Sequence, residues 1–203
     1  DIGYFNPASY SALTVTTFDV GFTNTALWLD DGTENQYKNN PYIDHIAFGV
    51  PMIKKKWGMS FGVLPFSNTG YEYDEVITDP FAGDKSSYSF GNGAINKVYW
   101  GNGFRTRIDS SSNISYGFNG YFLFGAMEYD QKIIYGDLAN AFNVWNLREI
   151  AVADFGADVG IQYEKSFTYT NKEGEKESLD LVLGVTYGLA SDLSAKRTEL
   201  LRT

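Results

Sequence analysis

The chain has 203 residues, of which 43% are hydrophobic and 17% aromatic, and its net charge is −9 at pH 7. This acidic balance disfavours a nucleic-acid partner, because binding to phosphates needs clustered Lys and Arg. The absence of Cys excludes disulfide frameworks and thiolate metal sites. No apolar run approaches the roughly 20 residues that a membrane-spanning helix needs.

Taken in chain order, seven segments show the two-residue alternation of a β-strand. Because side chains in a strand point alternately to its two faces, each segment predicts one apolar, often aromatic face. The other face carries small or polar residues. The segments are 14–29, 42–50, 57–66, 94–104, 114–124, 150–164 and 179–189.

The fifth segment, ISYGFNGYFLF, has the clearest alternation, with Ile114, Tyr116 and Phe118 on one face and Ser115 and Asn119 on the other. A soluble β-sandwich buries such an apolar face between two sheets. A membrane β-barrel turns it toward lipid and keeps the polar face inside.

The connections between the segments alternate in length. The medium and long ones are 30–41, 70–93 and 126–148, and the mostly shorter polar ones are 51–56, 105–112 and 166–177. Outer-membrane barrels have short turns on the periplasmic side and longer loops outside. We therefore expect an all-β protein of the cell outer membrane, an antiparallel up-and-down transmembrane β-barrel.

The number of segments is odd, and the tail after Leu189 shows no strand pattern. Bacterial single-chain barrels use even numbers of strands, and an open edge in lipid would leave backbone groups without partners. The residues are therefore expected to form about seven strands of a larger barrel, which they leave incomplete.

Four stretches have a more specific character: NPASYSAL (6–13), FGVPMIKKKWGMSFGVLPFSNTGYEY (48–73), GNGAINKVYWGNGF (91–104) and VADFGADVGIQYEKSF (152–167). Together they resemble the FadL/OmpP1/TodX family of outer-membrane transport proteins, in particular its Bacteroidetes members. The resemblance implies that residues 1–13 are the end of an N-terminal hatch. It also implies that residues 14–203 are strands of the N-terminal half of the barrel, with long outer loops.

The family resemblance suggests a lateral gate beside an inwardly kinked third strand. Pro65 lies in the third segment and cannot donate a hydrogen bond to a sheet, and Phe66, Asn68 and Gly70 follow it. These four residues are the candidate gate. The alternative is that the strand simply ends near Phe66, because strand prolines often mark ends.

The segment 126–148 is too apolar for a solvated loop. It is a candidate outer groove for a hydrophobic ligand, or else a self-packed loop or a surface for a partner protein. The candidate ligand-binding residues are Ile133, Ile134, Tyr135, Leu138, Phe142 and Trp145.

Four aspartates, Asp19, Asp154, Asp158 and Asp180, fall on the predicted inner faces. They are candidate lumen residues that line a polar route or bind the hatch, since buried charges need partners. His45 is the only histidine and is interpreted as a polar wall residue. Inner-face glycines such as Gly58 and Gly117 fit a wall in close contact with a plug.

Catalysis finds no support, because a single histidine allows neither a His-based metal cluster nor a usual catalytic triad. No dinucleotide or phosphate-binding loop is present, so neither enzymatic activity, a metal nor a cofactor is expected.

Three functions are open. The first is passive transport of hydrophobic small molecules, such as long-chain fatty acids, with lateral release into outer-membrane lipid. The alternative is a FadL-like barrel that acts as scaffold or partner subunit of an outer-membrane secretion complex. The third is a soluble, carbohydrate-binding β-sandwich. Both membrane hypotheses require that a set of apolar residues faces outward rather than into a core: Phe18, Phe61, Phe118, Phe155 and Leu183.

Overall fold

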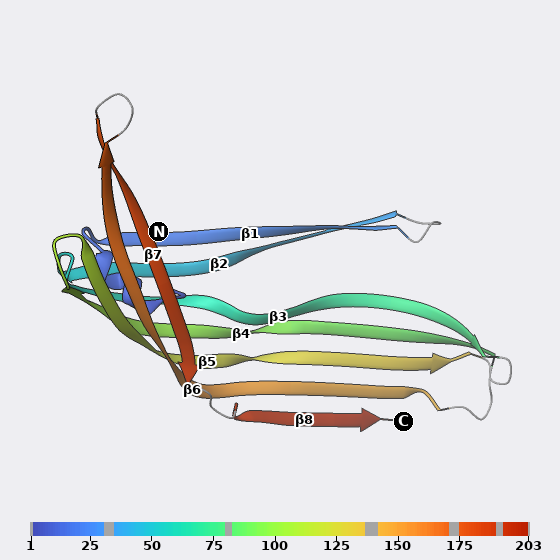
Figure 1. Ribbon diagram of the computed structural model, residues 1–203. Coiled ribbons are helices and arrows are strands. Elements are labelled where there is room, and N and C mark those ends of the chain that lie inside the picture. The colour runs from blue at the N-terminus through green and yellow to red at the C-terminus, as the bar shows by residue number, and fades with distance from the viewer. Residues whose placement is uncertain are drawn as a thin grey trace. The chain divides into compact units, whose positions relative to one another are not determined.

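The computed structural model describes residues 2–30, 35–79, 83–136, 142–170, 175–189 and 193–202, and 84% of these described residues are in strands (Figure 1). The predicted all-β class is confirmed. The elements are a 3-10 helix η1 (Pro7–Ala12) and the strands β1 (Thr17–Asp30), β2 (Asn35–Ile53), β3 (Trp57–Asp79), β4 (Gly83–Arg107), β5 (Ser112–Tyr135), β6 (Val144–Thr170), β7 (Lys176–Leu189) and β8 (Ala195–Arg202).

The strands form one antiparallel up-and-down sheet in the order β1-β2-β3-β4-β5-β6-β7. Each strand from β1 to β7 pairs with its neighbour in sequence, so no connection crosses another. Among the described residues the path of pairing ends at β1 and at β7, and the sheet is not closed. No helix in the described part of the chain is long and apolar enough to span a membrane.

The strands are longer than the sequence predicts. β3 to β6 have 23, 25, 24 and 27 residues, and they include most of the segments 70–93 and 126–148 that were expected to be long loops. In stretches such as 72–76 (EYDEV) polar side chains occur on both faces. The alternation that marks a half-buried strand is then absent, although the backbone is paired.

The tail after Leu189 also contains a strand that the sequence did not predict. β8 pairs with β6 from Val152–Ala195 to Trp145–Arg202, whereas β7 pairs with β6 up to Ala157–Leu189. The register of the two pairings differs by one residue. The alternation within a strand does not depend on this register. The segment 195–202 (AKRTELLR) carries charged side chains on both faces, so no apolar face marks it as a strand.

The chain divides into two compact units, which we call the first and the second unit. The first comprises residues 1–64, 98–121 and 155–191, and the second comprises residues 65–97, 122–154 and 192–203. β1, β2 and β7 belong to the first unit and β8 to the second, while β3 to β6 contribute residues to both.

The core of the first unit lies where the N-terminal segment 2–13 packs against its strands. Ile2, Tyr10, Ala47 and Tyr99 form a buried cluster there. The 3-10 helix η1 is capped by Asn6, whose side chain accepts a hydrogen bond from the N–H of Ala8, and Pro7 stands in its first turn. Both residues are favoured at these positions of a helical turn.

Candidate functional site

The apolar face of the first unit is exposed. The five residues that decide between lipid-facing and core-facing strands are Phe18, Phe61, Phe118, Phe155 and Leu183, which are 60%, 44%, 41%, 74% and 58% exposed. No second sheet covers this face within the described residues. The arrangement is therefore not that of a β-sandwich, in which two sheets bury their apolar faces against each other.

Aromatic rings form rows across this outer face. Phe48 of β2 lies between Phe18 of β1 and Phe61 of β3, with ring centroids 4.6 Å and 5.2 Å away. At the end with the short turns, the ring of Phe104 stacks near Trp57 at 5.9 Å and near Tyr116 at 5.7 Å. Such a group of rings at one margin of an apolar face is typical of the aromatic girdle of a membrane barrel.

The opposite face of the same strands is polar and carries the N-terminal segment. The hydroxyl of Tyr10 donates to the side-chain carbonyl of Asn119 at 3.1 Å, and Ser11 Oγ lies 3.0 Å from Ser115 Oγ. All four side chains are buried. Burial raises the pKa of Tyr10, so its hydroxyl remains protonated and able to donate at neutral pH.

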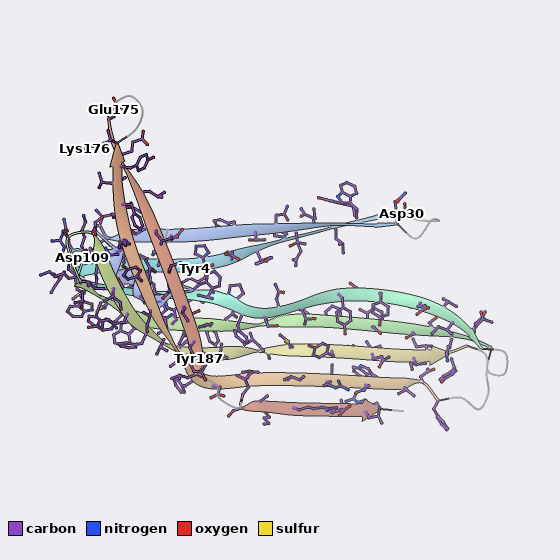
Figure 2. The ribbon with its side chains drawn as sticks, in the orientation of Figure 1. Tyr4, Asp30, Asp109, Glu175, Lys176 and Tyr187 are labelled. Atoms are coloured by element: carbon purple, nitrogen blue, oxygen red, sulfur yellow. The ribbon has the colours of Figure 1, made fainter. Side chains whose placement is uncertain are left out.

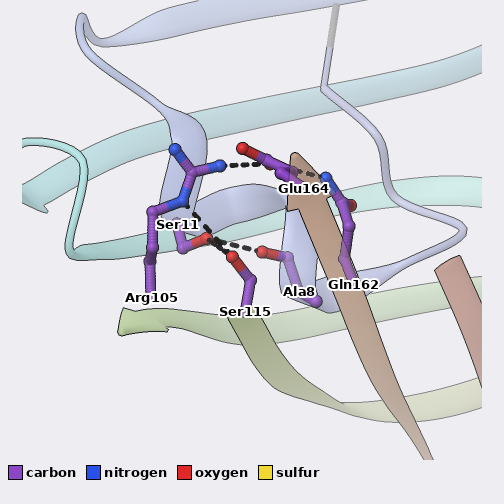
Figure 3. Close-up of polar contacts among 6 residues, drawn as sticks. All are labelled: Ala8, Ser11, Arg105, Ser115, Gln162 and Glu164. Atoms are coloured by element: carbon purple, nitrogen blue, oxygen red, sulfur yellow. Dashed lines mark hydrogen bonds and ion pairs between the residues drawn. The ribbon is translucent and has the colours of Figure 1, made fainter. Parts of the chain in front are cut away.

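An ion pair extends this network toward β6 (Figure 3). The guanidinium of Arg105 donates to the carboxylate of Glu164 through one nitrogen and to Ser115 Oγ through Nε. The side chain of Gln162 donates to the same carboxylate at 2.8 Å. Charged groups that leave water need such partners, and here they join β4, β5 and β6 beneath η1.

Two glycines allow the N-terminal segment to approach the wall closely. A Cβ atom at Gly58 would overlap the carbonyl oxygen of Tyr10, and one at Gly117 would overlap the backbone of Pro7. Asn6 donates from its side chain to the backbone carbonyl of Ile161 at 3.4 Å. The N-terminal segment is therefore fixed to strands β3, β5 and β6 of the first unit through its backbone and a side chain.

Of the four predicted lumen aspartates, Asp19 makes the clearest contact with the N-terminal segment. Its carboxylate accepts a hydrogen bond from the N–H of Ile2 at 3.2 Å. His45 Nε2 lies 3.5 Å from Asp19, and His45 Nδ1 lies 2.8 Å from Asp44. His45 is thus held between two carboxylates.

The other three lumen candidates have different surroundings. Asp158 is half-buried on β6, and a Cβ atom at Gly188 would lie 3.4 Å from its carboxylate. Asp154 accepts from the N–H of Ser194 at 2.9 Å in the second unit, and Asp180 is exposed on β7. The structure does not gather the four into one cluster, and their role in a lumen stays a prediction.

The candidate gate residues lie well inside β3, which continues to Asp79, so the alternative that the strand ends near Phe66 is wrong. Pairing between β2 and β3 runs as far as Ile46–Val63, and Pro65, which has no N–H to donate, follows shortly after. Pro65 is half-buried, whereas Phe66, Asn68 and Gly70 are exposed. Their role as a gate stays a prediction.

Four of the six candidate ligand-binding residues lie on strands rather than in a loop. Ile133, Ile134 and Tyr135 form the end of β5, and Trp145 lies near the start of β6. Phe142 is exposed between the two strands, and Leu138 lies outside the described residues.

Trp145 lies among charged groups of the second unit. Its indole N–H donates to Asp130, and Lys132 and Arg202 lie over its ring, each 5.1 Å from the centroid. Through these cation–π contacts the ring of Trp145 interacts with other residues of the fold. A role of these residues in binding a hydrophobic ligand stays a prediction.

Sequence reasoning did not single out the ion pair of Arg105 and Glu164. It assigned Arg105 to a short loop, yet Tyr99, Gly101, Gly103 and Arg105 fall on one face by the same two-residue alternation. That signal could have placed Arg105 on the inner face. Within the described residues no group of three or more His, Asp or Glu side chains could hold a metal ion.

The family model of BamG matches the chain over residues 1–203. BamG is a family associated with the BAM complex of the outer membrane, so the expected membership of the FadL/OmpP1/TodX family is wrong, and fatty-acid transport has no support. The residues of that resemblance reflect strand alternation and glycine–aromatic spacing, which many outer-membrane strands share. The predicted association with the outer membrane is supported. No curated protein and no solved structure matches the chain.

Proposed function

Since the chain belongs to the BamG family, we propose that it is a partner subunit of the outer-membrane BAM complex that crosses the lipid bilayer with its strands. In this role its outer face contacts acyl chains. Its inner face, with the N-terminal segment bound to it, forms a rigid scaffold.

The observation that carries the proposal is the exposure of the apolar faces. In β7 every outward position from Leu179 to Leu189 is apolar or aromatic, and all residues of the strand are exposed. Monomeric soluble proteins rarely expose apolar patches of more than a few hundred Å². Contact with lipid makes the exposure of such an apolar face energetically favourable.

The extent of the apolar face along one strand fits a bilayer. On β5 the outward positions from Ile114 to Ala126 carry no charge, and Glu128 is the first charged residue on that face. A tilted strand needs about 9–11 residues to cross the hydrocarbon core. The remaining residues of β5, up to Tyr135, would then lie in water, where both faces can be polar.

The inner face supports a structural rather than a transporting role. The N-terminal segment is held by the Tyr10–Asn119 hydrogen bond, by the approach of its backbone to Gly58 and by Ile2 on Asp19. Each contact ties it to a different strand. A surface of this kind gives a partner a fixed shape to bind, which lowers the entropy cost of association.

Affinity purification tests the proposal. The full chain, tagged and expressed at its native level, is isolated from outer membranes solubilised in mild detergent, with an unrelated tagged outer-membrane barrel as control. We expect subunits of the BAM complex to co-purify in stoichiometric amounts with this chain alone. Isolation of the chain without partner proteins would contradict the proposal.

A further inference from the structure

Basic side chains gather in a hollow at the short turns of the first unit. The hollow has a volume of about 420 Å³ and is lined by three residues of the β2–β3 turn, two at the end of β4 and one at the start of β5. We call it the basic hollow. Its lining consists of Lys54, Lys55, Lys56, Arg105, Arg107 and Asn113.

The basic hollow carries a local excess of positive charge in a chain whose net charge is −9. Arg105 is neutralised by its ion pair with Glu164. Within the described part of the chain, no ion pair engages Lys54, Lys55, Lys56 or Arg107. Four cations close together repel one another, and an anion with several oxygens would relieve this repulsion.

The backbone holds the two turns that carry these cations in a fixed relation. The N–H of Arg105 donates to the carbonyl of Lys56 at 2.7 Å, which joins the β2–β3 turn to the end of β4. In the neighbouring β4–β5 turn, the carboxylate of Asp109 accepts from the N–H of Ser111 at 2.7 Å, and this bond lowers the pKa of Asp109. The carboxylate of Asp109 is thus hydrogen-bonded within its own turn, and the basic hollow is preorganised.

The position of the basic hollow on the sheet distinguishes between two kinds of anion, the phosphate of a lipid headgroup and the carboxylate of a protein. Arg105 points to the inner face, where it meets Ser115 and Glu164. The aromatic side chains at the same level, Trp57 and Phe104, stack on the outer face. Phosphates of lipid headgroups would lie beside these rings, and so the hollow faces away from the lipid.

We propose that the basic hollow binds an acidic peptide segment of another subunit of the BAM complex. This inference rests on the proposed function and specifies the chemistry of the partner. The remainder of the chain is acidic and would repel such a segment, so the hollow also fixes where the partner binds. An extended strand or loop rich in Asp and Glu would supply carboxylates to the free lysines and to Arg107.

A binding measurement on the full chain in detergent micelles tests the inference. The probe is a fluorescent oligoglutamate peptide, followed by anisotropy. We expect the charge reversal K54E/K55E/K56E to weaken binding by about tenfold or more, since each removes an attraction and adds a repulsion. The matched control is K85E/K176E/K196E, which makes the same change in net charge at residues that do not line the basic hollow and should leave binding within about twofold.

Two further arms keep the test decisive. R107E changes one exposed side chain at the end of β4 and leaves the β2–β3 turn with its three lysines intact. We expect it to weaken binding of the peptide about threefold. A photoreactive residue at position 55, activated in intact cells, should cross-link to a protein subunit. Cross-linking to phospholipid alone, or equal weakening by the matched control, would overturn the inference.

Purification of the complex separates this inference from the proposed function. If wild-type chain isolates no BAM-complex subunits, the proposed function fails. If wild-type chain and K54E/K55E/K56E isolate the same subunits in the same amounts, even at raised salt, the proposed function stands and the basic hollow is not the docking site.

Discussion

At the residue scale, the inner face depends on a few polar side chains whose partners are far away in sequence. Tyr10 and Asn119, separated by 109 positions, form a buried hydrogen bond. Arg105 and Glu164 belong to different strands and neutralise each other. Removing one member of such a pair deprives a buried or partly buried polar group of that partner, which costs more than the bond itself contributes.

The substitution Tyr10→Phe should have two effects. The loss of the hydroxyl leaves the Asn119 carbonyl without this donor, and we expect a loss of about 1–3 kcal/mol in the free energy of unfolding. Because burial raises the pKa of Tyr10 above its usual value of 10.0, wild type should also lose stability as the pH rises above about 10, where only the unfolded state ionises. Denaturant titrations at several pH values measure both effects. The alkaline loss should be smaller in the variant, and an unchanged slope would contradict the assignment.

Gly58 offers a second test of the contact with the N-terminal segment. Gly58→Ala places a methyl group on the carbonyl of Tyr10, and we expect a cost of about 1–3 kcal/mol together with faster proteolysis of residues 2–13. Gly120→Ala is the control, because a Cβ atom there meets nothing within 4 Å. Equal proteolysis of the two variants would show that close packing at Gly58 does not hold the segment.

At the scale of the elements, the sequence predicts well the parts of the strands that belong to the first unit, and it predicts the remaining parts poorly. Alternation places Phe118 outward and Asn119 inward, as the structure has them. It fails for β8, because the segment 195–202 carries charged side chains on both faces and so has no apolar face. It also cannot show that Arg105 meets Glu164, because pairing across the sheet depends on the fold rather than on local sequence.

The pairing of β8 with β6 can be tested with two prolines. Successive N–H groups of a strand point to opposite sides, and β8 pairs on one side only among the described residues. Of Arg197→Pro and Thr198→Pro, one therefore removes an N–H that bonds to β6, and the other removes an N–H of the free edge. Hydrogen exchange of residues 195–202 should rise strongly in one variant and remain near wild type in the other. The same rise in both would mean that β8 is not held as the structure has it.

At the scale of the whole molecule, the two faces of the sheet meet different surroundings. The side chains drawn in Figure 2 include Tyr187, which belongs to the apolar row of β7 and is exposed. On the inner side of the first unit, small residues and hydrogen-bonded polar groups meet the N-terminal segment. The proposed function requires that only the outer face contacts lipid.

A pair of charged substitutions on β7 tests this requirement. Val185 is exposed on the outer face. Val185→Arg should destabilise the protein folded in phospholipid bilayers by about 2–4 kcal/mol if residue 185 lies near the midplane. Thr186→Arg adds the same side chain on the other face and should cost about 1 kcal/mol or less. Folding titrations in vesicles compare the two variants. If both cost the same, the outer face is not the lipid face.

The contacts of the N-terminal segment also set an order for assembly. Residues 2–13 bind to strands that are distant in sequence: Asn6 bonds to Ile161, which lies 155 positions further along the chain. Until β5 and β6 exist, residues 2–13 have few of their final partners and must stay loose. Residues 2–13 therefore reach their final contacts only once β5 and β6 have formed, and we expect the segment to become ordered together with these strands.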